Sequence, residues 1–220
     1  MKLLFAENLA VLLCAAGGLI YGGGRYLRRK QPLYASMIVL GVGCVMLGRM
    51  YQCVRLLTGY GITENFQVGI LGIAGAFLFF FSSNFAQIDS LVDDGGPEFA
   101  RYRYIALLGP ILIAALYVAV ALSPVQPVGK LVRAVVSVPI GASCYYHVKH
   151  MIVPDVDYGV VRCLRRFNGL TLIFGILCML EMLALAWSLE LPLLVVSVLL
   201  CAVCGAMIPV MDRGVQTWRT

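Results

Sequence analysis

The sequence predicts an all-α, polytopic membrane protein with about seven transmembrane helices. Hydrophobic residues make up 61% of the 220 residues, charged residues make up only 13%, and the mean hydropathy is +0.90. Soluble globular domains are much less apolar than this. The apolar residues are gathered into windows that match the length needed to cross a bilayer, roughly 20 residues each. We therefore expect one transmembrane helical domain, 1–220, without a soluble kinase or cyclase module.

Seven apolar windows follow one another along the chain, and short links separate them. The windows are 8–24, 33–57, 66–87, 104–123, 131–151, 167–188 and 191–211. The links hold most of the remaining charges, glycines and prolines, as in RRKQP, DDGGPE and SPVQPVG. Such punctuation is typical of turns between helices. The first window also resembles a signal peptide, but Glu7 interrupts its apolar stretch and RYLRRK follows it, so we expect a retained helix.

The lysines and arginines predict the orientation, because cytoplasmic loops of membrane proteins accumulate them. With the N-terminus outside, twelve basic residues fall on the inner side and five on the outer side. The inner set is Arg25, Arg28, Arg29, Lys30, Arg101, Arg103, Lys149, Arg162, Arg165, Arg166, Arg213 and Arg219, and the outer set is Lys2, Arg49, Arg55, Lys130 and Arg133. We therefore expect N-out/C-in topology in a cell membrane, specifically a bacterial inner membrane. The net charge of +6 reflects this topology and implies no nucleic-acid partner.

Arg49 and Arg55 stand at the end of the second window, where an uncompensated charge is costly. Glu181 is the one acidic residue deep inside the sixth window, and the predicted helix directions place it level with Arg49, about 10–12 Å below the outer face. Opposite charges at one depth predict either a structural ion pair or a binding site for an amino-acid-like or peptide-like ligand. Arg55 lies six positions from Arg49, so we expect it to point elsewhere and to snorkel to the interface. The candidate ligand-binding residues are Arg49, Tyr51, Arg55 and Glu181.

The inner end of the third window concentrates hydrogen-bonding side chains that lipid cannot satisfy. Ser82, Ser83 and Asn84 begin this stretch, and Gln87 and Asp89 continue it. We expect the group to line the bundle interior or an inward cavity, and the acidic loop that follows to be either a solvated turn or a partner of nearby basic residues. The candidate cytoplasmic polar cluster is Asn84, Gln87, Asp89 and Asn168.

The chain contains only two histidines, His147 and His150, whose spacing places them on one face of a helix. Together with Asp155 and Asp157 in the next loop they are the candidates for a metal site. Lys149 lies among them and no metalloprotease-type signature is present, so hydrogen bonding at the membrane boundary is the favoured interpretation. We expect no metal and no cofactor.

The cysteines, glycines and prolines are interpreted as packing and kinking residues. Most of the eight cysteines fall inside apolar windows, including the pair in CAVC, 201–204, so no disulfide framework is expected. Gly69, Gly72 and Gly75 recur about once per turn, which favours close helix packing. Three prolines inside windows can kink their helices: Pro110, Pro139 and Pro209.

Two function classes remain open. If the fourth window inverts the chain, windows one to three and five to seven share one orientation in a 3+1+3 arrangement, which is similar in layout to sugar transporters of the SWEET type. The compact chain without an expected effector domain, the prolines that can kink helices and the paired charges favour a small transporter or exporter of a small polar or zwitterionic solute. The alternative is a seven-helix receptor or sensor that signals through a partner protein. No paired catalytic motif points to an enzyme, and the expected partners are the bilayer, a small-molecule ligand and a homo-oligomer or signalling protein.

Overall fold

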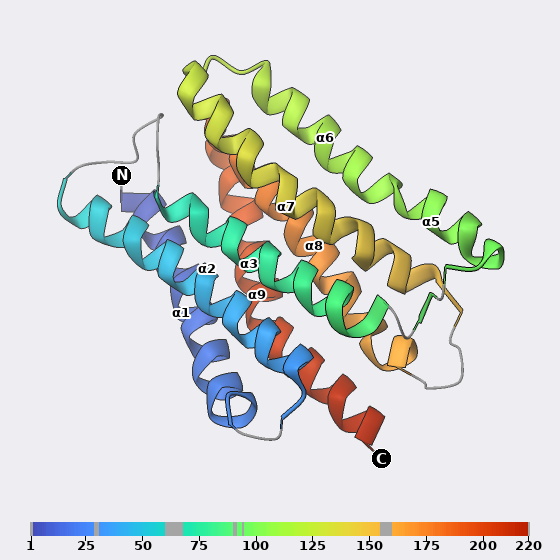
Figure 1. The fold of residues 1–220 in the computed structure, drawn as a ribbon. Coiled ribbons are helices and arrows are strands. Elements are labelled where there is room, and N and C mark those ends of the chain that lie inside the picture. Colours follow the sequence, from blue (N-terminus) through green and yellow to red (C-terminus); the bar gives the residue numbers. More distant parts are fainter. Residues whose placement is uncertain are drawn as a thin grey trace.

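The computed structural model describes residues 2–28, 31–59, 68–89, 92–93, 95–154 and 160–219, and within them the chain is all-helical. Figure 1 shows the helices as one elongated bundle. The elements are α1 (Lys2–Tyr26), α2 (Leu33–Leu57), α3 (Val68–Asn84), the π-helical turn η1 (Phe85–Asp89), the 3-10 turn η2 (Pro97–Phe99), α5 (Ala100–Ala106), α6 (Leu108–Ala121), α7 (Pro127–Ile152), α8 (Val160–Ala186) and α9 (Glu190–Arg219).

The expected polytopic architecture is confirmed. Six of the described segments are long and apolar enough to cross a membrane, and α3 is a shorter apolar helix. The fourth span runs from Pro97 to Ala121 but is interrupted at Leu107, between α5 and α6. Pro110 explains the interruption, because proline has no N–H to donate to the carbonyl four residues earlier. Pro139 and Pro209 lie inside α7 and α9, which continue through them.

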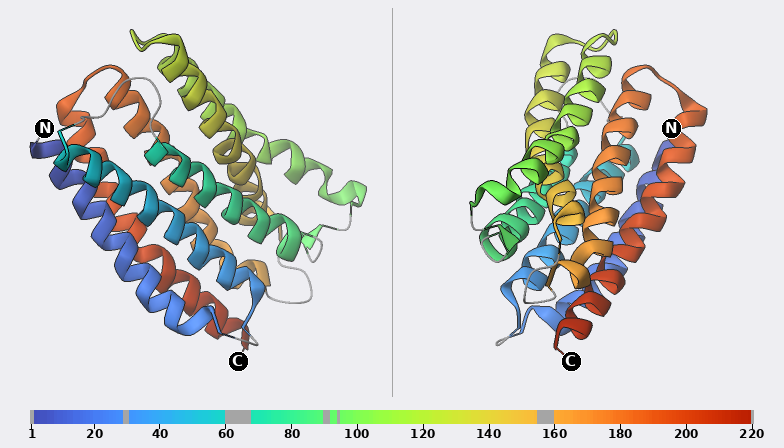
Figure 2. Two further views of the ribbon diagram at one scale, coloured as in Figure 1. Left: turned by 60° about the vertical axis from the view of Figure 1, so that its left-hand side comes forward. Right: turned by 90° about the vertical axis from the view of Figure 1, so that its right-hand side faces the viewer.

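Six helices form a closed ring in which each helix contacts the next. The order around the ring is α1, α2, α3, α7, α8 and α9, and α9 returns to α1. α6 lies outside this ring against α7 and α8, at the edge of the bundle in Figure 2. Its outer side chains, such as Leu108, Ile111 and Val118, are 56–61% exposed, as expected for a lipid-facing surface. The two chain ends lie at opposite ends of the bundle (Figures 1 and 2), which an odd number of crossings requires.

Glycines allow α2 and α3 to pack backbone against backbone. A Cβ atom added to Gly72 would lie 2.5 Å from the carbonyl oxygen of Cys44, and one added to Gly48 would lie 2.5 Å from that of Gly69. Only residues without a side chain permit this approach, which small residues commonly provide in membranes. The packing role expected for the glycines of the third window is therefore confirmed at Gly69 and Gly72.

A layer of aromatic rings fills the middle of the ring of helices. Phe77 and Phe174 stack with centroids 5.7 Å apart, and Phe80 packs edge-on against Phe167 at 6.3 Å. All four side chains are fully buried. Along α8, Phe174 lies about 10 Å from Glu181 in one direction and about 9 Å from Asn168 in the other, at 1.5 Å per residue. This layer therefore separates two buried polar regions, one toward each end of the bundle.

Candidate functional site

The first polar region centres on an ion pair between α2 and α8. Arg49 Nη1 lies 2.5 Å from Glu181 Oε1, and Arg49 Nη2 lies 2.5 Å from Glu181 Oε2. Both side chains are buried, with 4% and 6% of their surface exposed. Two parallel N–H···O bonds are the strongest geometry available to an arginine and a carboxylate. The expectation that these two residues face each other is therefore confirmed.

Residues from α1 and α2 surround the ion pair. Arg49 Nη1 also donates to Asn8 Oδ1 at 3.0 Å and lies 3.4 Å from Gln52 Oε1. Glu7 is 7% exposed, and among the described residues neither of its carboxylate oxygens has a hydrogen-bond partner. An ionised carboxylate without partners is strongly disfavoured in a buried site, so this environment suits the neutral, protonated acid. The region thus holds two buried carboxylates, Glu7 and Glu181, near Arg49, which forms its ion pair with Glu181.

A small cavity adjoins the ion pair, between α2, α3, α7 and α8. Its volume is about 30 Å³, which is room for roughly two water molecules. Arg49, Gln52 and Glu181 line its polar side together with Arg133 from α7, and apolar residues such as Ile73 line the rest. In this conformation the cavity admits water but no larger solute.

The other candidate ligand residues lie away from this cavity. Tyr51 is 36% exposed on the outer surface of α2, because two positions along a helix turn a side chain about 200° away from Arg49. Arg55 is half-buried and does not line the cavity. Of the four residues expected from the sequence, the structure brings Arg49 and Glu181 together at the cavity.

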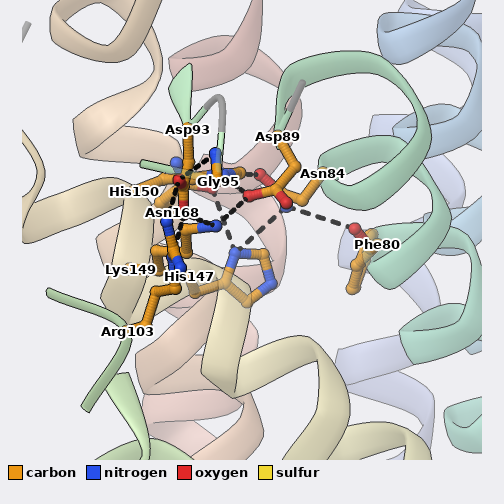
Figure 3. Close-up of polar contacts among 10 residues, drawn as sticks. All are labelled: Phe80, Asn84, Asp89, Asp93, Gly95, Arg103, His147, Lys149, His150 and Asn168. Carbon is orange, nitrogen blue, oxygen red and sulfur yellow. Dashed lines mark hydrogen bonds and ion pairs between the residues drawn. The ribbon is translucent and has the colours of Figure 1, made fainter. Parts of the chain in front are cut away.

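The second polar region lies at the opposite end of the ring and is drawn in Figure 3. Lys149 Nζ on α7 lies 2.6 Å from Asp89 Oδ1 and 2.7 Å from Asp93 Oδ2. Arg103 on α5 binds the same Asp93 through two bonds of 2.8 Å. Lys149 is only 3% exposed, so this network closes that end of the bundle with paired charges. It also ties the outer helix α5 to the ring.

Both histidines lie in this region and are fully buried. His147 Nδ1 lies 3.0 Å from Asn168 Oδ1 and its Nε2 lies 2.9 Å from Ser143 Oγ. A neutral ring that donates from Nδ1 and accepts the serine hydroxyl satisfies both contacts. Asn84 Nδ2 also lies 3.3 Å from His147 Nδ1. These uncharged partners hold His147 as a structural hydrogen-bonding residue.

His150 has a different pair of partners. Its Nδ1 lies 2.8 Å from Asn84 Oδ1 and its Nε2 lies 3.1 Å from Asp89 Oδ1. Asn84 presents its oxygen to His150 because its Nδ2 donates to the carbonyl of Phe80 at 3.1 Å. Since both ring nitrogens face acceptors, a ring protonated on both nitrogens donates both bonds. The contacts allow His150 to donate a hydrogen bond to Asn84 or to Asp89, while full burial acts against a positively charged ring.

Hydrogen bonds lower the pKa values of Asp89 and Asp93, the two carboxylic acids of this region. Burial acts to raise the pKa of Asp89, but hydrogen bonds from His150 and Lys149 outweigh it, and the pKa lies below its usual value. Hydrogen bonds from Arg103 lower the pKa of Asp93 strongly, and a hydrogen bond from Lys149 lowers it by a smaller amount. Both carboxylates are therefore ionised at neutral pH.

The candidate polar cluster is partly assembled as expected. Asn84, Asp89 and Asn168 lie together with the two histidines, and Ser83 is also fully buried, as expected for groups that avoid lipid. Gln87 belongs to η1, but its side chain lies outside the described residues.

Of the four candidate metal ligands, only His147 and His150 lie among the described residues. Asp155 and Asp157 also lie outside the described residues, and the ring nitrogens of both histidines are engaged in the hydrogen bonds given above. Within the described part of the chain, no three His, Cys, Asp or Glu side chains are grouped to hold a metal ion. No disulfide joins any two of the eight cysteines within the described part of the chain.

Sequence reasoning missed several residues of these two regions. Glu7 was visible as a charge that interrupts the first window, but nothing in the sequence placed it beside Arg49. Arg133 was assigned to the outer membrane boundary, whereas it is 8% exposed at the cavity. For Glu7 and Arg133 the missing information was the neighbouring helix. The ion pair of Asp93 with Arg103, by contrast, is one of the two alternatives expected for the acidic loop, and the structure shows it.

No protein-family model matches the chain, and comparison with curated proteins and with solved structures finds no match.

Proposed function

We propose that the protein is a transporter of a small zwitterionic solute, and that the residues around Arg49 and Glu181 bind that solute. The observation that carries this proposal is a cavity inside the ring of helices that is bordered by charges of both signs. Ionisable residues inside a membrane mark substrate or ion pathways by default, because burying them is costly.

The chemistry of the cavity favours a zwitterion. Arg49 and Arg133 offer guanidinium groups that bind a carboxylate, while Glu181 offers a carboxylate for an ammonium group. A zwitterion that enters between them replaces one ion pair with two, so no buried charge is left unpaired. A neutral sugar that separated Arg49 from Glu181 would leave both charges buried without a counter-charge.

The present conformation is closed, and binding requires the helices to separate. The cavity volume of about 30 Å³ is too small for an amino acid, and the direct contact of Arg49 with Glu181 fills the space between α2 and α8. At the other end Lys149, Asp89 and Asp93 close the ring. On α7, positions 133 and 149 are about 24 Å apart at 1.5 Å per residue. Two closures at this separation, with the aromatic layer between them, are the arrangement that alternating access requires.

A ligand screen followed by a transport assay tests the proposal. The purified full chain is heated with glycine, alanine, dipeptides, glucose and sodium succinate, and only zwitterions are expected to raise its melting temperature. The stabilising compound is then supplied in radiolabelled form to proteoliposomes, where we expect time-dependent uptake that excess unlabelled compound inhibits. Absence of both stabilisation and uptake overturns the proposal.

The receptor alternative makes a different prediction for the same assay. A receptor binds the compound and gains thermal stability, but proteoliposomes accumulate no more label than protein-free vesicles do. That combination would replace transport with sensing. The matched control is Arg28→Gln, which changes an exposed arginine outside the cavity and is expected to leave binding and uptake unchanged.

A further inference from the structure

A large groove opens at the end of the bundle that carries the C-terminus, far from the Arg49–Glu181 cavity. It has a volume of about 840 Å³ and lies between the last turn of α7, the beginning of α8 and the last part of α9. Figure 1 shows these three segments converging at that end. Neither the solute cavity nor the histidine cluster contributes a residue to its lining.

Four arginines line the groove and give it a strong positive charge. Three of them, Arg162, Arg165 and Arg166, share one face of α8, because positions three and four apart on a helix are neighbours. Arg213 approaches from α9. The helices meet closely here, since a Cβ atom on Gly214 would lie 2.5 Å from the carbonyl oxygen of Cys163. This contact sets Arg213 opposite the arginines of α8.

The positive charges of the groove are not balanced within the described part of the chain. Arg165 donates to the carbonyl oxygen of Val153 at 3.2 Å, and none of the four arginines forms an ion pair there. All four side chains are exposed, whereas the nearby Asp212 is buried and is used by Arg25 and two tyrosines. Like charges around one groove repel each other, so an anion that enters it is stabilised by all of them.

We propose that this groove binds a phosphate group, and specifically the headgroup of an anionic phospholipid. Guanidinium groups bind phosphate oxygens through paired hydrogen bonds, which favours phosphate over a simple halide. The lining of the groove also includes the apolar side chains of Met151 and Val210, which suit the glycerol and acyl portion of a lipid. Basic pockets between transmembrane helices are a known kind of headgroup site. The charge distribution also assigns this end to the cytoplasmic leaflet, where anionic lipids are enriched.

A comparison of lipid and free phosphate tests the proposal and separates the two sources of the group. The full chain in neutral detergent is titrated with short-chain phosphatidylglycerol, short-chain phosphatidylcholine or inorganic phosphate, and its melting temperature is followed. We expect stabilisation by phosphatidylglycerol and little effect of phosphatidylcholine. Equal stabilisation by inorganic phosphate would assign the site to a free phosphate compound instead. No stabilisation by either anion overturns the proposal.

Matched variants locate the effect. Arg162→Gln combined with Arg213→Gln should weaken the apparent affinity for phosphatidylglycerol about tenfold or more, since each lost charge-assisted hydrogen bond contributes on this scale. Arg28→Gln combined with Arg101→Gln removes the same charge at the same end but outside the groove, and should retain the affinity. Equal weakening in both double variants indicates general charge attraction and contradicts the proposal. Native mass spectrometry of the wild-type chain in mixed lipid gives a second readout, in which phosphatidylglycerol should be retained over phosphatidylcholine.

Discussion

Arg49 on α2 and Glu181 on α8 are 132 positions apart in the chain and are joined by two N–O contacts of 2.5 Å in the interior of the ring. Each charge is buried, so each depends on the other for its stability in the membrane. The same pair borders the cavity at which we propose that solute binds. The structural role of this pair and the solute-binding role that we propose for it therefore depend on one contact, and mutations can separate them.

Removing one partner of the pair should destabilise the protein strongly. Arg49→Ala leaves Glu181 buried without its counter-charge, which should lower the free energy of unfolding by about 3 to 5 kcal/mol. Unfolding in mixed detergent measures the change. The swap of Arg49→Glu with Glu181→Arg should recover part of the loss but not solute uptake, because binding requires the original arrangement of charges. Full recovery of both stability and uptake would show that the pair is purely structural.

The two buried carboxylates near Arg49 should respond differently to the same substitution. Glu7→Gln replaces an unpartnered acid with a neutral group of similar size and should leave stability within about 1 kcal/mol of wild type. Glu181→Gln removes the ion pair and should lower the free energy of unfolding by several kcal/mol. Both variants are compared by thermal unfolding at pH 7. A loss at Glu7 as large as the loss at Glu181 would mean that Glu7 acts as an ionised member of the network.

Two glycine substitutions should have opposite effects on stability. Gly72→Ala forces a Cβ atom to within 2.5 Å of the Cys44 carbonyl, so α2 and α3 must separate and the protein should lose about 1 to 3 kcal/mol. Gly17→Ala meets no atom within 4 Å and should instead gain about 0.5 to 1 kcal/mol, because alanine favours the helix. Melting temperatures of the two variants and the wild type check the prediction. A stable Gly72→Ala variant would contradict the close packing.

The ion pairs of Asp93 should weaken only in acid. The folded-state pKa of Asp93 lies below its unfolded value of about 3.9, so the stability that its ionised form contributes is fully present above that value and is lost as the pH falls through the folded pKa. Asp93→Asn should therefore be less stable than wild type at pH 6 to 7, and the two melting curves should approach each other toward pH 3. A stability difference that stays constant from pH 7 to pH 3 would count against the ionised Asp93. Glu98→Gln is a suitable control, because Glu98 is an exposed acid of the same loop.

The orientation of the chain is a prediction from its charges. Reporter fusions after Thr220 test it, since a cytoplasmic C-terminus should yield a fluorescent or cytoplasmically active reporter and an inactive alkaline phosphatase. Fusions in the link between α2 and α3 should give the opposite result. A phosphatase that is active after Thr220 would reverse the orientation and move the arginine groove to the outer leaflet.

The sequence by itself determined the class of the protein, the positions of the spans and the matching levels of Arg49 and Glu181 along their helices. These are properties of single helices. Hydrophobic length fixes which segments cross the bilayer, and the rise of 1.5 Å per residue fixes how far Arg49 and Glu181 lie from the helix ends. Because both helices were predicted to run in the same direction, matching depth was sufficient to predict their pairing.

Only the tertiary structure decided which residues join that pair and how the opposite end is closed. Glu7 lies on α1, whereas Arg133 and Lys149 lie near opposite ends of α7. Their neighbours depend on how each helix is rotated and which helix it packs against. The rotation and the neighbours of each helix are fixed by packing, such as the glycine contact of α2 with α3, and this packing involves residues far apart in the chain. A one-dimensional pattern records depth and spacing along a helix, but contact between helices is a property of the packed bundle.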